Sequence, residues 1–428
     1  MSRVRLFLVK FFVVIFLVVI FLTGYSIYLD KKIDKLYDEN KQMVNHINGL
    51  AEKDKGNSLI SRSLVDGNIL LMGSSELTSP VPENIKNFFP NNFYAYDIST
   101  VGHATVQNAL HAMNLGANSD SIQDNPVMIV ESLQWFMNDE INVPGFFSNF
   151  SELQFYEFLN NKKISKDNKI YLCKRYMELE NSNDIRIKPQ LLSKFSDGYI
   201  NKLVNLFPSN IVMSNITNKQ TFLLARLYSS ENLIEKILYY VMKPYYWIRY
   251  KILNIRDKYY AYQWLNSLGE IVSKESIDID WNDEYLKAEK TGKESCTNND
   301  IFVYDEYYDT YLKEKWTELK NGYDNVELMT SNEWNDFEFF LNVCDDLGIK
   351  PYIVIMSTNG LYYDYTGMNK ARRDELYDKI DMLSSNHKFD VLNLKDYEYN
   401  PYFYCDVMHL GWKGWTYVTQ KAIEHFSK

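Results

Sequence analysis

The chain has 428 residues, which is enough for one large domain with insertions or for roughly two to three domains of about 150 residues each. Hydrophobic residues make up 46% and charged residues 24%, a composition typical of globular rather than disordered proteins. The formal net charge of −10 disfavours nucleic acid as a partner, because such binding depends on cationic side chains that neutralise phosphates. The four cysteines show no CxxC spacing, so neither a disulfide framework nor a cysteine-rich zinc module is indicated. We expect no metal site and no cofactor.

The first distinct segment is the apolar run Leu6–Tyr28. As a helix it would be about 35 Å long, against roughly 30 Å of bilayer hydrocarbon. Its one charge, Lys10, lies near the start beside Arg3 and Arg5, and such a positive end stays in the cytoplasm. A cleaved signal peptide is the alternative, but the run is long for one. We therefore predict that residues 1–29 are a cytoplasmic tip and a single-pass transmembrane signal anchor in the cell membrane.

The anchor is followed by a charged segment with sparse apolar positions, which is typical of a helical stalk. We assign residues 30–66 to this stalk. Residues 67–428 then form an extracytoplasmic globular domain.

An alternation of strands and helices opens the globular domain. The run from Asn68 to Met72 reads as a buried strand, a second strand-like segment begins at Phe93, and a third begins at Pro126. Helical spacing follows the second strand and is expected to stop at Gly116. This order predicts an open parallel α/β sheet with flanking helices, in which sites collect at the carboxyl ends of the strands.

A long middle segment, about residues 152–323, has apolar residues at helical intervals and few glycines, so we predict a helical insertion. The α/β pattern then resumes. Its expected elements are an amphipathic helix from Ser331 that stops at Gly348, a strand over 351–357, a helix near 372–383, a strand over 389–394 and a last helix at about 411–426.

The triplet Gly73-Ser74-Ser75 places a serine in a tight turn directly after the first strand. A hydroxyl there can project above the sheet edge, so Ser75 is the candidate nucleophile. Taken alone, the triplet is more typical of a strand-ending turn that caps a helix than of a catalytic serine.

A second pattern supports a catalytic interpretation. Asp406 precedes His409 by three residues, just before the last predicted helix. A carboxylate bound to one ring nitrogen fixes the imidazole tautomer and leaves the other nitrogen to take the serine proton. The sequence therefore predicts a triad of Ser75, His409 and Asp406, although a helix cap and a turn residue are the alternative reading of the last two.

Ester chemistry at a serine also requires donors that stabilise the oxyanion. The candidates are the backbone amides of Ser75 and Gly102, which both follow predicted strands, and the side-chain amide of Gln134 at the end of the third strand. Gln134 is equally consistent with a polar residue that leaves the sheet beside core aromatics.

The early Gly-x-Ser, the glycine after the second strand and the late Asp-x-x-His resemble the SGNH (GDSL-like) hydrolase superfamily. A more specific resemblance, to the DltD family, is carried by five short segments. These are MGSSEL (Met72–Leu77), LQWF (Leu133–Phe136), TNN (Thr297–Asn299), SNEWNDF (Ser331–Phe337) and DVMHLGWKGW (Asp406–Trp415). The sequence departs from the family pattern at Leu133, where proline is usual, and at Asp300, where a Pro-Phe-Gly continuation is expected.

The resemblance implies a protein that is anchored by one N-terminal helix, carries an SGNH-like domain outside the cell and takes part in D-alanylation of lipoteichoic acid. It implies Ser75 as catalytic serine, His409 as its base and Asp406 as the orienting acid. It also implies a D-alanyl donor and a membrane-bound O-acyltransferase as partner. Two alternatives stay open: an esterase or O-acetyltransferase acting on envelope glycans, and a non-catalytic, membrane-anchored binding subunit of the D-alanylation machinery.

Overall fold

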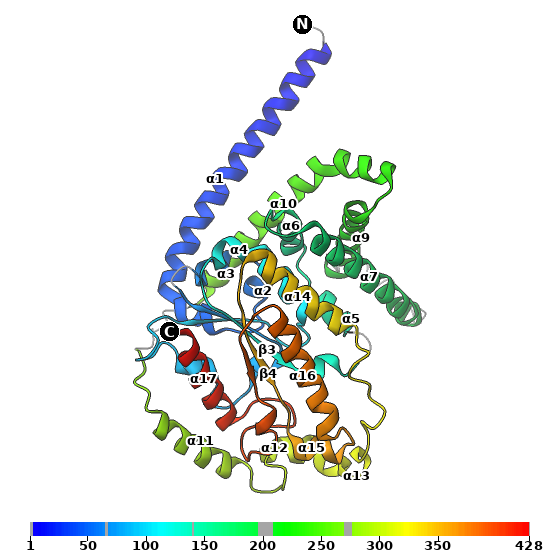
Figure 1. Cartoon of the computed structure of the whole chain (residues 1–428). Helices are drawn as coiled ribbons and strands as arrows, with labels where there is room; N and C mark the ends of the chain where they lie inside the picture. Colours follow the sequence, from blue (N-terminus) through cyan, green and yellow to red (C-terminus); the bar gives the residue numbers. More distant parts are fainter. Residues whose placement is uncertain (1–2, 65–66, 139–140, 196–208, 269–275, 428) are drawn as a thin grey trace.

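The computed structural model describes residues 3–64, 67–138, 141–195, 209–268 and 276–427 (Figure 1). Among these residues, the side chains of 3–9, 11, 12, 14, 15, 183–195 and 209–217 are outside the description.

The centre of the molecule is a five-stranded sheet in the described part of the chain. Its strand order is β2-β1-β3-β4-β5 and every neighbouring pair is parallel. The strands are β1 (Ile69–Met72), β2 (Ile98–Val101), β3 (Val127–Ser132), β4 (Tyr352–Met356) and β5 (Val391–Asn393). All residues of β1 to β4 are buried, which explains why β1, β3 and β4 contain continuous apolar runs rather than alternating patterns. The predicted parallel α/β fold is confirmed.

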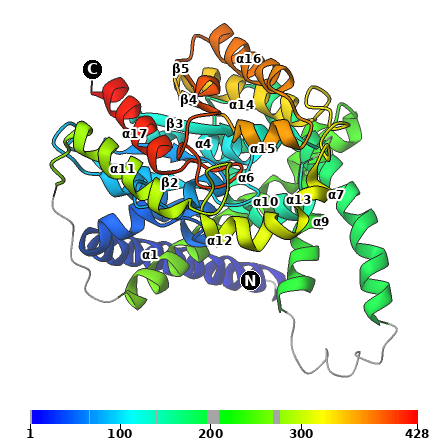
Figure 2. The same cartoon turned by 90° about the horizontal axis from the view of Figure 1, so that it is seen from below.

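Helices cover both faces of the sheet, because successive strand residues point to opposite sides. On one face, Leu70 and Met72 pack with α4 (Asn108–Ile122), α14 (Glu333–Leu347) and α16 (Lys370–Asn386). On the other face, Ile69 and Leu71 pack with α17 (Trp412–Phe426), and α11 (Trp281–Ser295) lies against α17. Figure 2 shows α17 and α11 on one side of the strands and α4 and α14 on the other.

The helices and strands after the insertion agree with the expected pattern. Helix α14 ends at Gly348, whose φ of 70° is the left-handed conformation that favours glycine at a helix end. Strand β4 and helices α16 and α17 also lie where the sequence predicts them.

Two local predictions were wrong. The second strand begins at Ile98 rather than at Phe93, because Asn91 accepts hydrogen bonds from the backbone amides of Phe93 and Tyr94 and holds that segment in a turn. The helix α4 does not stop at Gly116 but continues to Ile122. The ring of Phe158 packs so closely there that a Cβ on residue 116 would lie 2.2 Å from it, so this glycine serves helix packing rather than helix termination.

Between residues 152 and 323 the described chain is mostly helical. The long helices are α6 (Glu152–Asn160), α7 (Lys166–Phe195), α9 (Ser209–Ser229), α10 (Leu233–Ser267) and α11. The same region also contains the shorter helical segments α12 (Asp305–Tyr307), η4 (Tyr308–Leu312), η5 (Lys313–Lys315) and α13 (Trp316–Leu319). Short helical segments outside it include α2 (Ala51–Asp54), α3 (Ser58–Ser63), η2 (Ile85–Phe88), α5 (Val143–Asn149), α15 (Gly360–Tyr365) and η6 (Lys395–Tyr397).

The N-terminal helix α1 (Arg3–His46) projects from the body at its beginning and packs on the body at its end (Figure 1). Leu29 and Ile33 contact Ala261 and Leu265 of α10. The last turn of α1 lies beside the edge strand β2, where the His46 ring bonds to Asp97 at 2.6 Å. In the part of the chain that the structure describes, no helix combines the length and hydropathy that a membrane crossing requires. Several side chains of the predicted anchor, among residues 6–15, lie outside the described part.

Candidate active site

The candidate nucleophile Ser75 follows β1 and begins the short helix η1 (Ser75–Thr78). The neighbouring strand β2 ends at Val101, and Gly102, whose φ is +116°, follows it. A Cβ at position 102 would lie 1.9 Å from the carbonyl oxygen of Gly73, so only glycine permits this approach of the two strand ends. The serine is thereby held at the carboxyl edge of the sheet. In this strand order, that edge lies beside the β1/β3 switch point, where open α/β sheets bind ligands.

The loop before α17 carries His409 and Asp406. One carboxylate oxygen of Asp406, Oδ1, accepts hydrogen bonds from the backbone amides of Met408 and His409, each at 2.8 Å. The loop is closed by the amide of Cys405, which donates to the carbonyl of His409 at 3.0 Å. These contacts fix the carboxylate and the ring relative to each other.

The three predicted residues lie in one chain of hydrogen bonds, although Ser75 and His409 are 334 positions apart in the sequence. The Nε2 atom of His409 is 3.0 Å from the Ser75 hydroxyl oxygen. Its Nδ1 atom is 2.7 Å from Oδ2 of Asp406. A serine, an imidazole and a carboxylate at these distances have the geometry of an acyl-transfer triad.

The charge around His409 favours a strong base. Burial lowers the pKa of His409, but the hydrogen bond and negative charge of Asp406, together with the charge of Glu76, outweigh burial and raise this pKa above its usual value. Glu76 itself is buried directly after Ser75, and burial raises its pKa to about 7. Its carboxylate accepts a hydrogen bond from the backbone amide of Ser74 at 2.6 Å, so it also holds the turn that carries the serine.

The oxyanion candidates lie at the same edge of the sheet. Gly102 contacts the Gly73 carbonyl next to the serine turn. Gln134 lies in the short helix η3 (Leu133–Phe136), directly after β3, the other strand that pairs with β1. Its Nε2 group is buried and has no hydrogen-bond partner among the described residues, so it is a donor available to a ligand. No hydrogen bond joins it to Ser75 or His409 in the described structure.

Sequence reasoning missed a buried acidic cluster near this edge. Glu131 of β3 and Glu333 of α14 both accept hydrogen bonds from the Asn108 side chain, at 3.1 and 3.0 Å. Burial raises the pKa of Glu131 to about 8 and raises that of Glu333 well above its usual range. The signal that could have revealed the cluster is a charged residue inside the otherwise apolar strand PVMIVES.

Two further histidines, His103 and His111, border a small cavity next to Gly102. The His103 ring bonds through Nδ1 to Asp54 at 3.0 Å, and the cavity that it borders has a volume of about 20 Å³. His111 is fully buried, and burial lowers its pKa to about 3, so the ring stays neutral. Within the described residues, no group of three or more His, Cys, Asp or Glu side chains is arranged to hold a metal ion.

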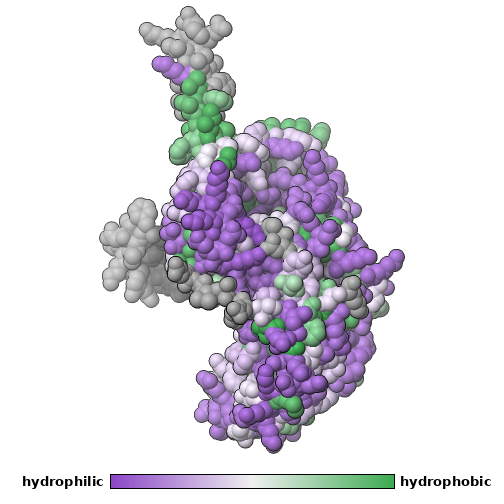
Figure 3. Space-filling model, turned by 90° about the vertical axis from the view of Figure 1, so that its left-hand side faces the viewer, coloured by the Kyte–Doolittle hydropathy of each residue, from purple (hydrophilic) through white to green (hydrophobic). Residues whose placement is uncertain are grey.

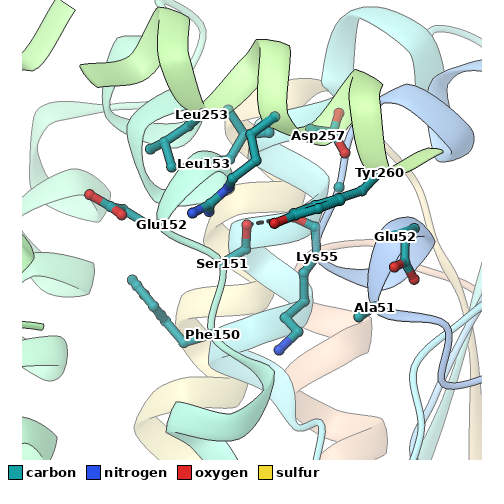
Figure 4. A pocket seen from close by; sticks show the side chains of 12 residues that line it. Ala51, Glu52, Lys55, Phe150, Ser151, Glu152, Leu153, Leu253, Asp257 and Tyr260 are labelled. Atoms are coloured by element: carbon teal, nitrogen blue, oxygen red, sulfur yellow. Dashed lines mark hydrogen bonds between the residues drawn. The ribbon is translucent and has the colours of Figure 1, made fainter. Parts of the chain in front are cut away.

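A larger cavity of about 300 Å³ lies between α2, α6 and α10 (Figure 4). Its serine, Ser151, donates to the backbone carbonyl of Lys55. Its buried acid, Asp257, accepts from the amide and hydroxyl of Ser58. No histidine lines this cavity, so its polar groups do not form a second serine–histidine pair.

The family model described as DltD protein matches residues 50–427. The chain belongs to the DltD family. The resemblance carried by the five sequence segments is thus confirmed, and the matched range contains the triad together with Gly102 and Gln134.

Curated DltD relatives match along most of their length. Protein DltD of Bacillus subtilis is 27% identical over 358 residues, which cover 84% of this chain and 82% of the relative. Protein DltD of Staphylococcus aureus is 23% identical over 362 residues, 83% of this chain and 80% of the relative. Protein DltD of Lacticaseibacillus rhamnosus is 20% identical over 367 residues, 86% of this chain and 79% of the relative.

Proposed function

We propose that this DltD-family chain is an extracytoplasmic serine acyltransferase that passes D-alanine to lipoteichoic acid or a related envelope polymer. The observation that carries the proposal is the hydrogen-bonded chain from Ser75 through His409 to Asp406. Family membership supports the choice of D-alanine as the acyl group.

In the first step, His409 Nε2 takes the hydroxyl proton while Ser75 Oγ attacks the carbonyl carbon of a D-alanyl donor. The resulting imidazolium is stabilised by Asp406, to which it donates through Nδ1. Collapse of the tetrahedral intermediate breaks the bond to the donor's leaving group, which receives the proton from His409. The product is a D-alanyl ester on Ser75.

In the second step, a hydroxyl of the polymer gives its proton to His409 and attacks the ester carbonyl. The serine oxygen leaves and takes the proton back, so the enzyme returns to its starting state. Water can replace the polymer hydroxyl in this step, which would make the same site an esterase. Transfer therefore requires that the polymer reach the ester faster than water does.

Both steps form an oxyanion that needs hydrogen-bond donors. We assign this role to the backbone amides of Ser75 and Gly102 and to the side chain of Gln134. The absence of a partner for Gln134 Nε2 within the described structure supports its assignment, because a buried amide donor without an acceptor is costly unless a ligand supplies one.

Location and partners form part of the same proposal. We propose that residues 1–29 carry the anchor, that residues 30–66 connect it to the domain at 67–428, and that the domain lies outside the cytoplasm. A membrane-bound O-acyltransferase would supply the D-alanyl group across the membrane. Tethering confines Ser75 near this donor and near a lipid-linked acceptor, which raises their effective concentration.

The deciding experiment measures D-alanyl ester on the envelope polymer in cells whose only copy of the protein is Ser75→Ala. The expected result is loss of the ester at normal protein level. Ser61→Ala is the matched control, because that hydroxyl donates within its own helix to Ser58. Unchanged ester in the Ser75→Ala cells would defeat the catalytic proposal and favour a binding subunit.

Hydrolysis and transfer are separated with the purified full chain. A serine-directed probe first tests whether Ser75 is reactive. Incubation with a D-alanyl donor, with and without a glycerol-phosphate polymer, then shows where the acyl group goes. Free D-alanine in both cases would indicate an esterase, whereas ester on the polymer supports a transferase.

A further inference from the structure

The outer face of α10 is apolar and uncovered in the described structure. We define this face by Ile234, Ile237, Val241, Trp247, Ile248 and Ile252, which are 53–75% exposed. The five aliphatic residues follow one another at intervals of three, four and seven, so they share one side of the helix, with Trp247 next to them. Monomeric proteins rarely leave so long an apolar row in water.

The opposite side of the same helix is buried in the body. Tyr246 and Leu253 are 5% and 3% exposed and belong to the main core cluster. The core therefore packs against only one side of α10, and core packing does not explain the apolar residues on the outer face. A helix with apolar residues on both sides is expected where one side meets the core and the other meets a second apolar medium.

The charge of α10 between Lys236 and Arg256 indicates which apolar medium the outer face meets. From Lys236 to Arg256 the sequence contains five basic residues and no acidic residue, in a chain whose net charge is −10. Lysine side chains also lie over aromatic rings at this surface, with Lys243 Nζ 5.5 Å from the Tyr240 centroid and Lys251 Nζ 5.8 Å from that of Trp247. Tyrosine, tryptophan and long cationic side chains beside apolar residues are typical of helices that lie in a membrane interface.

The position of α10 points to the same medium. Its C-terminal part packs on α1, where Lys258 Nζ is 2.6 Å from Asp30. From there, the helix reaches the end of the body beside which α1 projects (Figure 1). On α1, the side chains of Phe16 and Phe21 are 64% and 69% exposed. Figure 3 shows hydrophobic residues on α1 and at the neighbouring end of the body.

A cavity of about 310 Å³ opens at the edge of this face, where Lys243, Pro244 and Trp247 line it. The hydroxyl groups of Tyr156 and Tyr246, which also line it, are buried and have no partner among the described residues. Two phenol donors beside an ammonium group match the oxygens of a phosphodiester.

We propose that the outer face of α10 lies in the interface of an anionic lipid bilayer, as a second membrane contact beside α1. Lys236, Lys243 and Lys251 extend to the phosphates while the aliphatic and aromatic side chains enter the boundary with the acyl chains. The contact holds the body against the membrane at a fixed orientation. It does not depend on the reaction proposed for Ser75.

The test places a fluorophore on this face in the full chain. Because the four native cysteines are buried, a surface cysteine takes a thiol-reactive, environment-sensitive fluorophore selectively. One sample carries it at Val241→Cys and the matched control at Leu286→Cys on α11, an aliphatic residue with the same 68% exposure at the other end of the body (Figure 1). Ile248→Cys provides a second position on the outer face.

Each labelled chain is combined with vesicles of phosphatidylcholine alone or with equal parts phosphatidylglycerol. A blue shift and quenching by lipid-borne quenchers are expected for the Val241 and Ile248 labels in the anionic vesicles, and neither for the Leu286 label. The triple variant Lys236→Gln, Lys243→Gln, Lys251→Gln should weaken insertion about fivefold for each charge removed. The matched triple variant Lys287→Gln, Lys290→Gln, Lys293→Gln on α11 should leave it unchanged.

Three results would overturn the proposal. The first is a Val241 label that stays as aqueous as the Leu286 label in anionic vesicles, which would leave the face to a protein partner. The second is a shift without lipid that grows with protein concentration, which would indicate a second copy of the chain. The third is a blue shift of equal size in neutral and anionic vesicles, which would show that the lysines do not select anionic lipid.

Discussion

Replacing Asp406 with asparagine should nearly abolish the reactivity of Ser75 while the fold is kept. The reason lies in the two oxygens of this carboxylate. Oδ1 accepts from the backbone amides of Met408 and His409, both at 2.8 Å, and Oδ2 faces His409 Nδ1 at 2.7 Å. An asparagine must place its oxygen against the two backbone donors and its amino group against Nδ1. The ring then accepts at Nδ1 and keeps its proton on Nε2, so it cannot take the proton of Ser75.

The size of the effect follows from the alternative orientation of the amide. If the side-chain amide of the Asp406→Asn variant turned over, its amino group would face the two backbone N–H donors and both hydrogen bonds would be lost. At about 1–2 kcal/mol for each lost hydrogen bond, this orientation costs about 2–4 kcal/mol. The productive tautomer would then be present at roughly 3% down to 0.1%. Loss of the charge that stabilises the imidazolium lowers the rate further. We expect a total decrease of about 10³- to 10⁴-fold.

The assay is the second-order rate of labelling by a serine-directed probe, measured from pH 5 to pH 9 on the full chain. In the unmodified protein, the rate should fall as the pH drops through a His409 pKa that lies above its usual value. In Asp406→Asn the main influence that raises this pKa is gone and burial remains, so the residual rate should fall at a lower pH. A rate within tenfold of the unmodified protein at pH 8, or an unmoved acid limb, would refute this reasoning.

Three further variants test the surroundings of the triad. Gly102→Ala should cost at least about 2 kcal/mol of stability in urea unfolding and slow probe labelling, because its Cβ would lie 1.9 Å from the Gly73 carbonyl at a strained φ; an unchanged protein would contradict this. Glu131→Gln keeps an acceptor for Asn108 and removes a carboxyl whose folded pKa, about 8, exceeds its usual 4.5. The folded state keeps the Glu131 carboxyl protonated at pH values where the unfolded state has lost that proton. The contribution of Glu131 to the free energy of unfolding is therefore complete below pH 4.5 and falls by up to about 5 kcal/mol as the pH rises to 8. The variant should gain relative stability at pH 8 over pH 5, and an equal difference at both pH values would count against it. Glu76→Gln should move the acid limb of probe labelling slightly downward, because its charge is the weakest of the influences that raise the pKa of the triad imidazole; an upward shift would be inconsistent with this.

The strands and the helices after the insertion could be predicted from the sequence because their signals are local. Continuous apolar runs mark strands that are buried on both faces, as in β1 and β3. A glycine after an amphipathic repeat marks a helix end, as Gly348 does for α14. Where a local signal has two uses, the prediction was wrong. Gly116 is a helix-packing residue under Phe158, and nothing in its own neighbours distinguishes this use from a helix stop.

The sequence by itself determined the residue types that can perform serine chemistry and the predicted elements beside which they lie. A serine after the first strand and a histidine three residues after an aspartate are both visible in the chain. Only the tertiary structure decided that they are in contact. Ser75 and His409 are 334 positions apart, and the strand order together with the loop before α17 brings them to hydrogen-bonding distance. The same holds for the acidic cluster around Glu131 and for the outer face of α10. Burial of a charge and exposure of an apolar row depend on which elements pack against them, and this packing joins residues that are remote in the sequence.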